Sequence, residues 1–358
     1  MCMKTVYEIR AATILYNLAR GDENRDCIYL VPANTCPVVP IALLSAGRKI
    51  EFIDIDPDTL CMDQEGVWRR CLDAEAPPVG SLVFIRTYGV ETDMRKFFAP
   101  LKLRFPDIIV IDDRCAARPE PEVEKVDPQG ADIILYSTGY AKYCDLGFGG
   151  FAHMKKERTY QRYSLTYRPG DLAEITDIYK TNIAAGTPIS TAGETPAGFW
   201  KSYAWLDTGR PKVPWSEYVR LLLEKRVLAD EHKAGLNSLY TAIIPDHVRF
   251  PDLFNRWRFQ IRVADKNALL RKLKEENLFA SDHYFPASFL FHAKECPGAE
   301  LLHRVIVNLF NDFYINREQA GQVALIVRSH VLAEDGSNVL RKNRCRPSTG
   351  PRDAALDE

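Results

Sequence analysis

The sequence predicts an α/β protein with a large domain built on a mostly parallel β-sheet, followed by a smaller α/β domain. In the first half of the chain, short β-branched or apolar runs alternate with segments of helical periodicity, which is typical of βαβ units. A second pattern of helices and strands begins near residue 215. The chain has 358 residues, enough to bury two cores of unequal size.

The spacing of apolar residues predicts the individual elements. Strands of the large sheet are predicted at 27–31, 50–53, 82–85, 108–111 and 133–136, with helices between them at 38–46, 64–72 and 93–104. Residues 148–154 are predicted to form a glycine-rich turn that leads into an edge strand. For the second domain, helices are predicted at 215–240, 266–277 and 317–332, and strands at 257–263 and 305–309.

These elements predict two domains and a tail. Residues 1–214 form the large domain, in which 155–214 is an atypical insert or active-site segment with one helix at 171–180. Residues 215–332 form the small C-terminal α/β domain. The stretch 333–358 is polar and rich in Arg, Asp, Pro and Gly, so it is predicted to be a disordered tail.

Composition and charge exclude several classes of function. The net charge is −1, from 47 Lys and Arg against 48 Asp and Glu, so no overall field favours nucleic acid or an anionic membrane. No apolar run is long enough to span a bilayer, and the N-terminal residues lack the apolar stretch of a secretory signal. The nine cysteines form no Cys-x-x-Cys pair, and the histidines show no zinc-like spacing. We therefore expect a cytoplasmic protein with reduced thiols, no metal and small-molecule partners.

Chemically active side chains follow three of the predicted strands. Arg86 and Tyr88 follow strand 82–85, Asp112 and Asp113 follow strand 108–111, and the run 137–142 follows strand 133–136. In a parallel α/β sheet, ligands bind just beyond the carboxyl ends of the strands. An acid, a group of hydroxyls and a lysine are therefore expected to meet at one edge of the sheet.

This set of residue types matches the needs of pyridoxal 5′-phosphate (PLP) chemistry. A lysine such as Lys142 forms an imine with the cofactor aldehyde, and a carboxylate keeps the pyridine nitrogen protonated. Hydroxyls and backbone N–H groups near a turn bind the phosphate. The alternative interpretation of Lys142 is a surface lysine in a loop, because lysines are common there.

The order of several short motifs resembles the DegT/StrS family of PLP-dependent sugar aminotransferases. The similar pieces are 31–36, Gly47, 52–56, Tyr88-Gly89 with Asp93-Met94, Ile111-Asp112-Asp113 with Cys115-Ala116, Ser137 five residues before Lys142, Gly149-Gly150, 282–286 and 305–309. Together they cover the chain from about Tyr7 to Val331. The resemblance implies a fold type I PLP-dependent transferase with a seven-stranded sheet and, as in the family, a homodimer with the site at the subunit interface.

The resemblance also implies roles for individual residues. Lys142 is the Schiff-base lysine, Asp113 is the partner of the pyridine nitrogen and Ser137 is a phosphate ligand, whereas Asp112 packs or caps nearby. The run Arg10-Ala11-Ala12 resembles the N-terminal phosphate-binding turn. The further residues implied near the cofactor or the substrate are Thr35, Tyr88, Arg10, His283 and Tyr284, although an aromatic such as Tyr88 at a strand end is at least as often simple packing.

The chain departs from the family pattern at several of these positions. Ile9 replaces a glycine before the phosphate-binding turn, Cys36 replaces an aromatic over the cofactor ring, Ala116 replaces a Gln or His, and Gly139 replaces a His. The family's Asn-Tyr-Arg segment, which reaches into the neighbouring subunit, has no clear counterpart in 155–214. The substrate pocket is therefore expected to differ from that of familiar members.

Three functions follow from the resemblance and from these departures. The first is transfer of an amino group, from glutamate, to a nucleotide-linked keto-sugar in the biosynthesis of a surface polysaccharide or a natural product. The second is a PLP-dependent sugar dehydratase, which Lys142 disfavours because those relatives resemble the family with histidine in place of the lysine. The third is a binding or regulatory protein that has lost efficient chemistry, and the substitutions at Cys36, Ala116 and Gly139 are its evidence.

Overall fold

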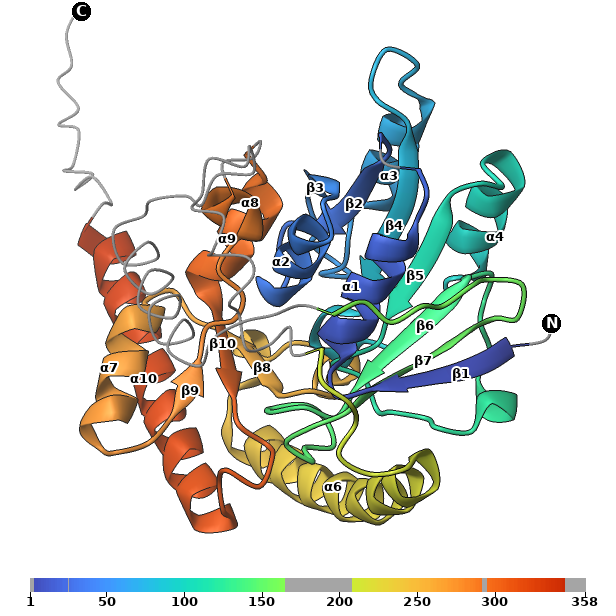
Figure 1. Ribbon diagram of the computed structural model, residues 1–358. Helices are drawn as coiled ribbons and strands as arrows, with labels where there is room; N and C mark the ends of the chain where they lie inside the picture. Colours follow the sequence, from blue (N-terminus) through green and yellow to red (C-terminus); the bar gives the residue numbers. More distant parts are fainter. Residues whose placement is uncertain (1–2, 25, 165–207, 292–294, 345–358) are drawn as a thin grey trace, which may run out of the picture.

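Seven strands form the large sheet, in the order β1-β7-β6-β5-β4-β2-β3 (Figure 1). The computed structural model describes residues 3–24, 26–164, 208–291 and 295–344. Strands β2 to β6 pair in parallel, whereas β7 runs antiparallel to its neighbours β6 and β1. This confirms the predicted fold class. The strands are β1 (Met3–Glu8), β2 (Ile28–Pro32), β3 (Lys49–Ile53), β4 (Val79–Ile85), β5 (Ile109–Asp113), β6 (Ile133–Ser137) and β7 (Gly150–Lys155).

The N-terminal strand β1 is missing from the sequence prediction, and it changes the position of β7. The predicted edge strand after the glycine-rich turn is wrong, because β1 covers the outer side of β7 along its whole length, from Met3 beside Lys155 to Glu8 beside Gly150. The turn before β7 does form as predicted. Gly149 has a φ of 94°, a left-handed conformation that glycine adopts without steric cost.

The pleat of the sheet separates the two aspartates at the end of β5. Successive side chains of a strand point to opposite faces, so Asp112 and Asp113 lie on different sides of the sheet. The strand register places Phe84 beside Asp112 and Leu135 beside Asp113. Ser137, two residues beyond Leu135, therefore shares the face of Asp113. We refer to these two sides as the Asp112 face and the Asp113 face.

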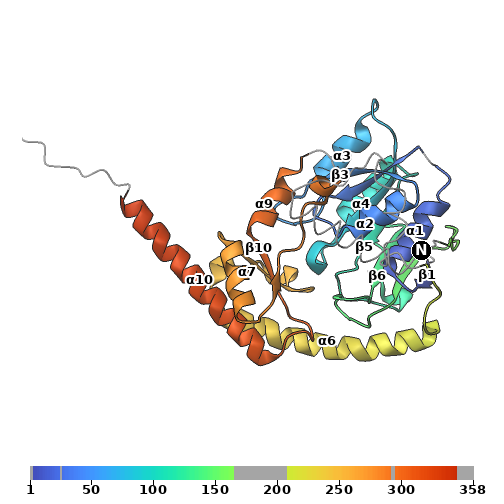
Figure 2. The ribbon, with the colours of Figure 1, turned by 60° about the vertical axis from the view of Figure 1, so that its left-hand side comes forward.

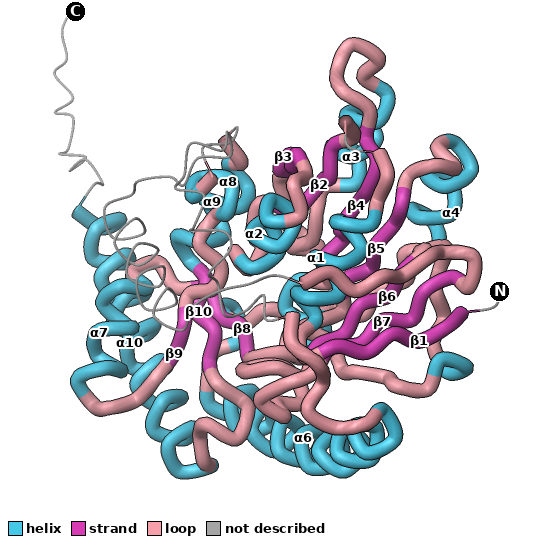
Figure 3. The backbone as a smooth tube through the Cα atoms, viewed as in Figure 1, coloured by secondary structure: helices cyan, strands magenta, loops and turns pink. Residues whose placement is uncertain are grey.

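Helices cover both faces (Figure 3). On the Asp112 face, Phe98 of α4 (Arg95–Arg104) packs edge-on against Phe84, with ring centroids 5.4 Å apart. On the Asp113 face, α1 (Ala11–Gly21) begins against β7, because a Cβ on Gly150 would lie only 2.2 Å from the nitrogen of Ala11. The remaining helices of this domain are α2 (Val38–Ser45), which packs on α1, and α3 (Gln64–Leu72).

Asp112 forms the centre of a buried ion cluster. Its Oδ1 accepts from Arg86 Nε at 2.7 Å, and its Oδ2 accepts from Arg86 Nη2 and Arg114 Nε, both at 2.9 Å. Burial raises the pKa of Asp112, but the charges of Arg114 and Arg86 outweigh it and lower the pKa overall. The cluster joins the ends of β4 and β5, and it satisfies the expectation that Asp112 packs nearby.

We expect Asp112→Asn to destabilise the fold by about 3–5 kcal/mol, because it leaves two guanidinium groups without their buried counter-charge. Urea unfolding followed by circular dichroism measures this free energy. A change below about 1 kcal/mol would contradict the view that this cluster holds the strand ends together.

The C-terminal part of the chain builds a second, three-stranded sheet in the order β8-β10-β9, with antiparallel pairing. Its own hydrophobic core contains Phe259, Leu269 and Val327. The division of the chain at 214/215 stays a prediction, although α6 begins at Trp215. The elements are α6 (Trp215–Ile243), β8 (Phe259–Arg262), α7 (Lys266–Glu275), β9 (Ala280–Ser281), α8 (Ala287–Leu290), α9 (Pro297–Val305), β10 (Ile306–Leu309) and α10 (Arg317–Arg344).

Helix α6 links the two cores. Figure 2 shows it running below both parts of the molecule. Tyr218 near its start belongs to the core of the large sheet, whereas Tyr240 near its end belongs to the core of the small one. A single long helix therefore fixes both sheets, and residues on it can reach the loops between them.

Two predictions about flexible or irregular segments change with the structure. The disordered tail from residue 333 is wrong for 333–344, because α10 continues to Arg344. Residues 345–358 and the helix predicted at 171–180 lie outside the described residues. Among the described helices, none combines the length and the apolar character needed to cross a membrane.

Candidate functional site

The loop between β6 and β7 carries Lys142. Leu146 N donates to Thr138 O at 2.9 Å, which closes the loop across its base. Directly before the lysine, Ala141 N donates to Asp145 Oδ2 at 2.8 Å. These bonds fix the backbone of Lys142 just beyond the carboxyl end of β6, where a parallel sheet binds its ligands.

The Lys142 side chain is half-buried, and its amine has no hydrogen-bond or ion-pair partner within the described ranges. Burial is the largest influence on Asp113 and Cys36 and raises the pKa of both groups. The positive charge of Lys142 acts on both in the opposite direction and lowers their pKa. The structure therefore brings Lys142 close to Asp113, as the sequence predicts from the ends of β5 and β6.

Asp113 is a buried carboxylate at the end of β5, only 3% exposed. Its Oδ1 accepts from Cys115 N at 2.9 Å. Burial raises the pKa of Asp113, while the hydrogen bonds from Cys115 and the charge of Lys142 act against that rise. A carboxylate held in this way can bind a protonated ring nitrogen and keep it charged.

The start of α1 meets the end of β6 at a position suited to an anion. Arg10 is the N-cap of α1, but its side chain does not cap the helix and instead reaches Gly147 O at 3.5 Å. A Cβ on Gly139 would lie 3.4 Å from Arg10 Nη1 and 3.5 Å from Ser137 Oγ, so Gly139 lies between them. A guanidinium, a hydroxyl and the positive end of a helix favour a phosphate group here. Ala11 and Ala12 supply the first backbone N–H groups of the helix.

Thr35 and Cys36 lie in the loop between β2 and α2. Thr35 is buried, and its Oγ1 donates to Cys36 O at 3.5 Å. Burial and then the neighbouring thiol of Cys36 raise the pKa of Tyr284, which follows β9 in the chain. Cys36 and Tyr284 thus lie together beside Lys142, whereas Thr35 supports the loop.

Tyr88 is placed as the packing residue that the sequence offers as the alternative to a pocket residue. The side chain is fully buried rather than facing an open pocket, and its OH donates to His283 O at 2.9 Å. Its ring stacks on Tyr284, with centroids 6.2 Å apart. Tyr88 therefore supports the backbone of the 281–286 segment, and the exposed side chain of His283 is the part of that segment available to a substrate.

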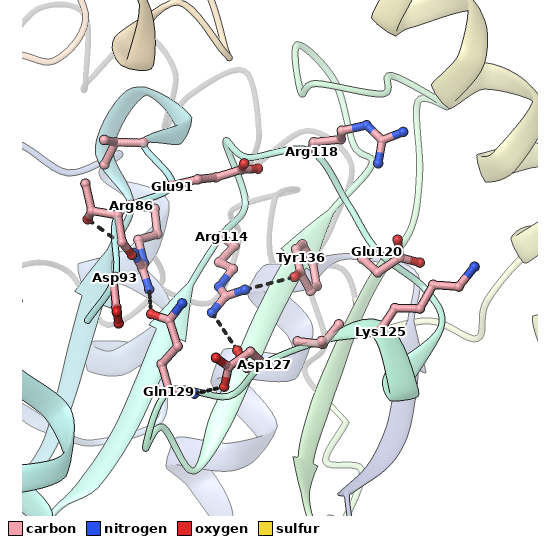
Figure 4. Close-up of a pocket in the computed structure, with 13 residues that line it drawn as sticks. Arg86, Glu91, Asp93, Arg114, Arg118, Glu120, Lys125, Asp127, Gln129 and Tyr136 are labelled. Atoms are coloured by element: carbon pink, nitrogen blue, oxygen red, sulfur yellow. Dashed lines mark hydrogen bonds between the residues drawn. The ribbon is translucent and has the colours of Figure 1, made fainter. Parts of the chain in front are cut away.

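A cavity of about 460 Å³ opens on the Asp112 face (Figure 4). In this view Arg114 points toward Tyr136, to whose OH it donates at 3.4 Å, and Arg86 donates to Gln129 Oε1 at 3.2 Å. The arginines that line the cavity donate hydrogen bonds to other residues of the chain. The sheet separates the cavity from Asp113. The cavity is therefore distinct from the predicted cofactor site.

Two residues around Lys142 are missing from the sequence prediction. Trp257, two residues before the start of β8, donates its indole N–H to Ala141 O at 2.7 Å. Asp145 accepts from Ala141 N on the same loop. The Asp145 contact is a short-range loop bond that the sequence could suggest, but the Trp257 contact joins residues 116 positions apart and has no local signal.

Comparisons with solved structures identify the fold. The chain is similar to a DegT DnrJ EryC1 StrS aminotransferase from Brucella abortus, with 15% identity, a TM-score of 0.62, and 91% of this chain and 86% of that chain covered. It is similar to NtdA from Bacillus subtilis with bound PMP cofactor, with 17% identity, a TM-score of 0.62 and coverages of 92% and 73%. It is also similar to DesI in the presence of its TDP-sugar product, with 15% identity, a TM-score of 0.64 and coverages of 95% and 83%.

No protein-family model matches the sequence, and no curated protein is similar to it in sequence. The structural likeness extends over nine-tenths of the chain or more, and it includes both the large sheet and the small domain. The chain therefore has the fold of the PLP-dependent sugar aminotransferases, as the sequence motifs predict.

Proposed function

We propose that this protein is a PLP-dependent aminotransferase of the DegT/StrS type that acts on a sugar. The observation that carries the proposal is that Lys142, an amine without a hydrogen-bond or ion-pair partner among the described residues, lies close enough to the buried carboxylate of Asp113 for its charge to act on it. Perturbed titratable groups at the carboxyl ends of parallel strands are a mark of an active site. The shared fold with known aminotransferases supports it.

The residues present fit the cofactor. Asp113 offers a buried carboxylate for the pyridine nitrogen, and Lys142 offers a primary amine for the aldehyde carbon. At the other end, Ser137, Arg10 and the start of α1 surround Gly139, whose missing side chain leaves room beside them. The anion position and the carboxylate lie on the same face of the sheet, as one elongated cofactor requires.

When bound, PLP supplies the electron sink that stabilises a negative charge on the substrate carbon. The protein residues provide the rest of the chemistry. Asp113 holds the proton on the ring nitrogen. Lys142 Nζ acts as general acid and base and carries a proton between the substrate carbon and the cofactor carbon. The fixed loop of Lys142 keeps this amine within reach throughout.

We further propose that the acceptor is a keto-sugar linked to a nucleotide diphosphate, that glutamate is the amino donor and that the enzyme works as a homodimer. The TDP-sugar product of DesI and the pseudoaminic acid pathway of the Helicobacter pylori aminotransferase PseC support a sugar acceptor by analogy of fold. Exposed His283 and the neighbouring Tyr284 offer polar groups for that acceptor.

Mass spectrometry of the purified protein with PLP, glutamate and a panel of nucleotide keto-sugars tests this proposal. Amine transfer appears as the replacement of a carbonyl oxygen by an amino group in one sugar, with conversion of glutamate to 2-oxoglutarate. Loss of a hydroxyl without amine transfer would instead support the dehydratase. Failure to take up PLP in a spectroscopic titration would support the alternative of a binding or regulatory protein without efficient chemistry. The evidence for that alternative is the set of substitutions at Cys36, Ala116 and Gly139.

We expect Arg10→Gln to raise the Kd for PLP about tenfold or more, because a charged hydrogen bond to phosphate contributes roughly 1.5–3 kcal/mol. The matched ligand is pyridoxal, which lacks the phosphate and should bind wild type and variant equally. Fluorescence titration of the cofactor-free protein measures both constants. Equal loss of pyridoxal affinity would show that Arg10 acts on something other than the phosphate.

A further inference from the structure

The residue before Lys142 has an unusual backbone conformation. Ala141 has a φ of 57°, in the left-handed region that residues with a Cβ adopt at a cost. Both of its backbone polar groups are held: its N–H donates to Asp145 Oδ2 at 2.8 Å, and its carbonyl accepts from Trp257 Nε1 at 2.7 Å. Because the direction in which Lys142 leaves the loop depends on this backbone, the two bonds set the position of the lysine.

Trp257 is itself fixed on several sides. It is 5% exposed, its backbone N–H donates to Tyr88 O at 3.2 Å, and its backbone carbonyl accepts from Lys233 Nζ at 2.9 Å. Its ring stacks on Tyr284, with centroids 5.8 Å apart and planes 9° apart, and lies 6.3 Å from the ring of Tyr88. The indole N–H therefore has a fixed direction before it meets the loop.

The same contacts connect two parts of the protein. Trp257 precedes the first strand of the small sheet, whereas Ala141 follows the sixth strand of the large one. Lys233, which holds the Trp257 carbonyl, lies on α6, the helix shared by both cores. A movement of the small domain against the large one would therefore act directly on the backbone beside Lys142.

We propose that Trp257 is the positioning residue for Lys142: its indole N–H holds the Ala141 carbonyl and so aims the lysine amine at the Asp113 side of the site. The proposed role of Trp257 rests on the proposed function in one respect only, namely that the group bound by the Lys142 amine is PLP. The arrangement of Trp257, Ala141 and Lys142 stands on its own contacts.

The test uses Trp257→Phe in the full chain, because phenylalanine keeps an aromatic ring that can stack and removes the N–H donor, while the lost ring volume is matched by the control below. The first measurement is the rate at which an amine-reactive reagent labels Lys142 in the cofactor-free protein, followed by peptide mass spectrometry. A released loop exposes the half-buried lysine, so labelling should become about threefold faster or more. The second measurement is the Kd for PLP, which should rise about tenfold, the loss expected for one buried hydrogen bond.

Trp215→Phe is the matched control. Trp215 also lies in an aromatic cluster, stacked on Tyr218 with centroids 5.5 Å apart, but its ring packs against Tyr7 and Phe151 and not against Ala141. It should leave both the labelling rate and the Kd unchanged. Equal labelling of Lys142 in wild type and Trp257→Phe, or an equal change in Trp215→Phe, would overturn the proposal.

A second variant covers the case in which Trp257→Phe does not fold. Asp145→Ala removes the other bond to Ala141 from a half-buried position and should speed the labelling of Lys142 in the same direction. An unchanged labelling rate in that variant would overturn the proposal as well. If wild type fails to take up PLP, the proposed function fails, while the labelling result still decides the role of Trp257.

Discussion

Lys142→Ala is expected to reduce amine transfer by about 10⁴-fold, the largest effect of any single substitution in this chain. The variant loses both the amine that holds the cofactor covalently and the group that moves the proton, and positioned acid–base groups alone contribute up to that factor. Steady-state assays with glutamate measure the loss. The near-visible absorbance band of the lysine-bound cofactor, and its sensitivity to borohydride, should disappear with it.

Lys142→Arg is the matched control for charge. Arginine keeps a cation beside Asp113 but cannot form a Schiff base, because its guanidinium stays protonated. We expect it to be as inactive as Lys142→Ala. If Lys142→Arg retains activity within tenfold of wild type, Lys142 acts through its charge, and the cofactor is held by another group.

The central residues of the candidate site could be predicted because the topology of the sheet brings them together. In a parallel sheet all strands end at one edge, so Asp113 and Ser137 meet there although 24 residues separate them in the sequence. The alternation of side chains along β5 also separates the roles of Asp112 and Asp113 without any further information. Local patterns therefore contain most of the geometry of the candidate cofactor site.

The residues that support the site could not be predicted in the same way. Tyr88 and Trp257 act through contacts that join segments more than 100 residues apart, and no pattern in the residues beside them indicates those partners. Strand β1 has no helix or turn signal before it, and its place beside β7 is decided by tertiary pairing. The extension of α10 over a polar stretch shows the same limit, since composition does not fix where a helix ends.

The two neighbouring aspartates give the second large prediction, because the fold assigns them opposite effects. Asp113→Asn should lower turnover roughly 10²- to 10³-fold, since the amide cannot hold the ring nitrogen protonated and one preorganised electrostatic contact is lost. Its stability should stay at or above that of wild type, because the substitution removes a buried charge whose pKa is raised by burial. Asp112→Asn, the matched control, should show the reverse: a less stable protein whose folded fraction keeps the cofactor spectrum.

The pH dependence provides an independent measurement on Asp113. Its folded-state pKa is raised, so as the pH falls toward that value the carboxylate takes up a proton and can no longer pair with a protonated ring nitrogen. Wild type should therefore lose activity on the acidic side of its optimum, and this acidic limb should be absent in Asp113→Asn, whose side chain does not titrate. Rate profiles of both proteins between pH 5 and pH 8, with glutamate as donor, compare the two limbs directly. If the acidic limb is equally steep in both proteins, a group other than Asp113 causes the loss of activity. That result would contradict the proposed role of this carboxylate at the ring nitrogen.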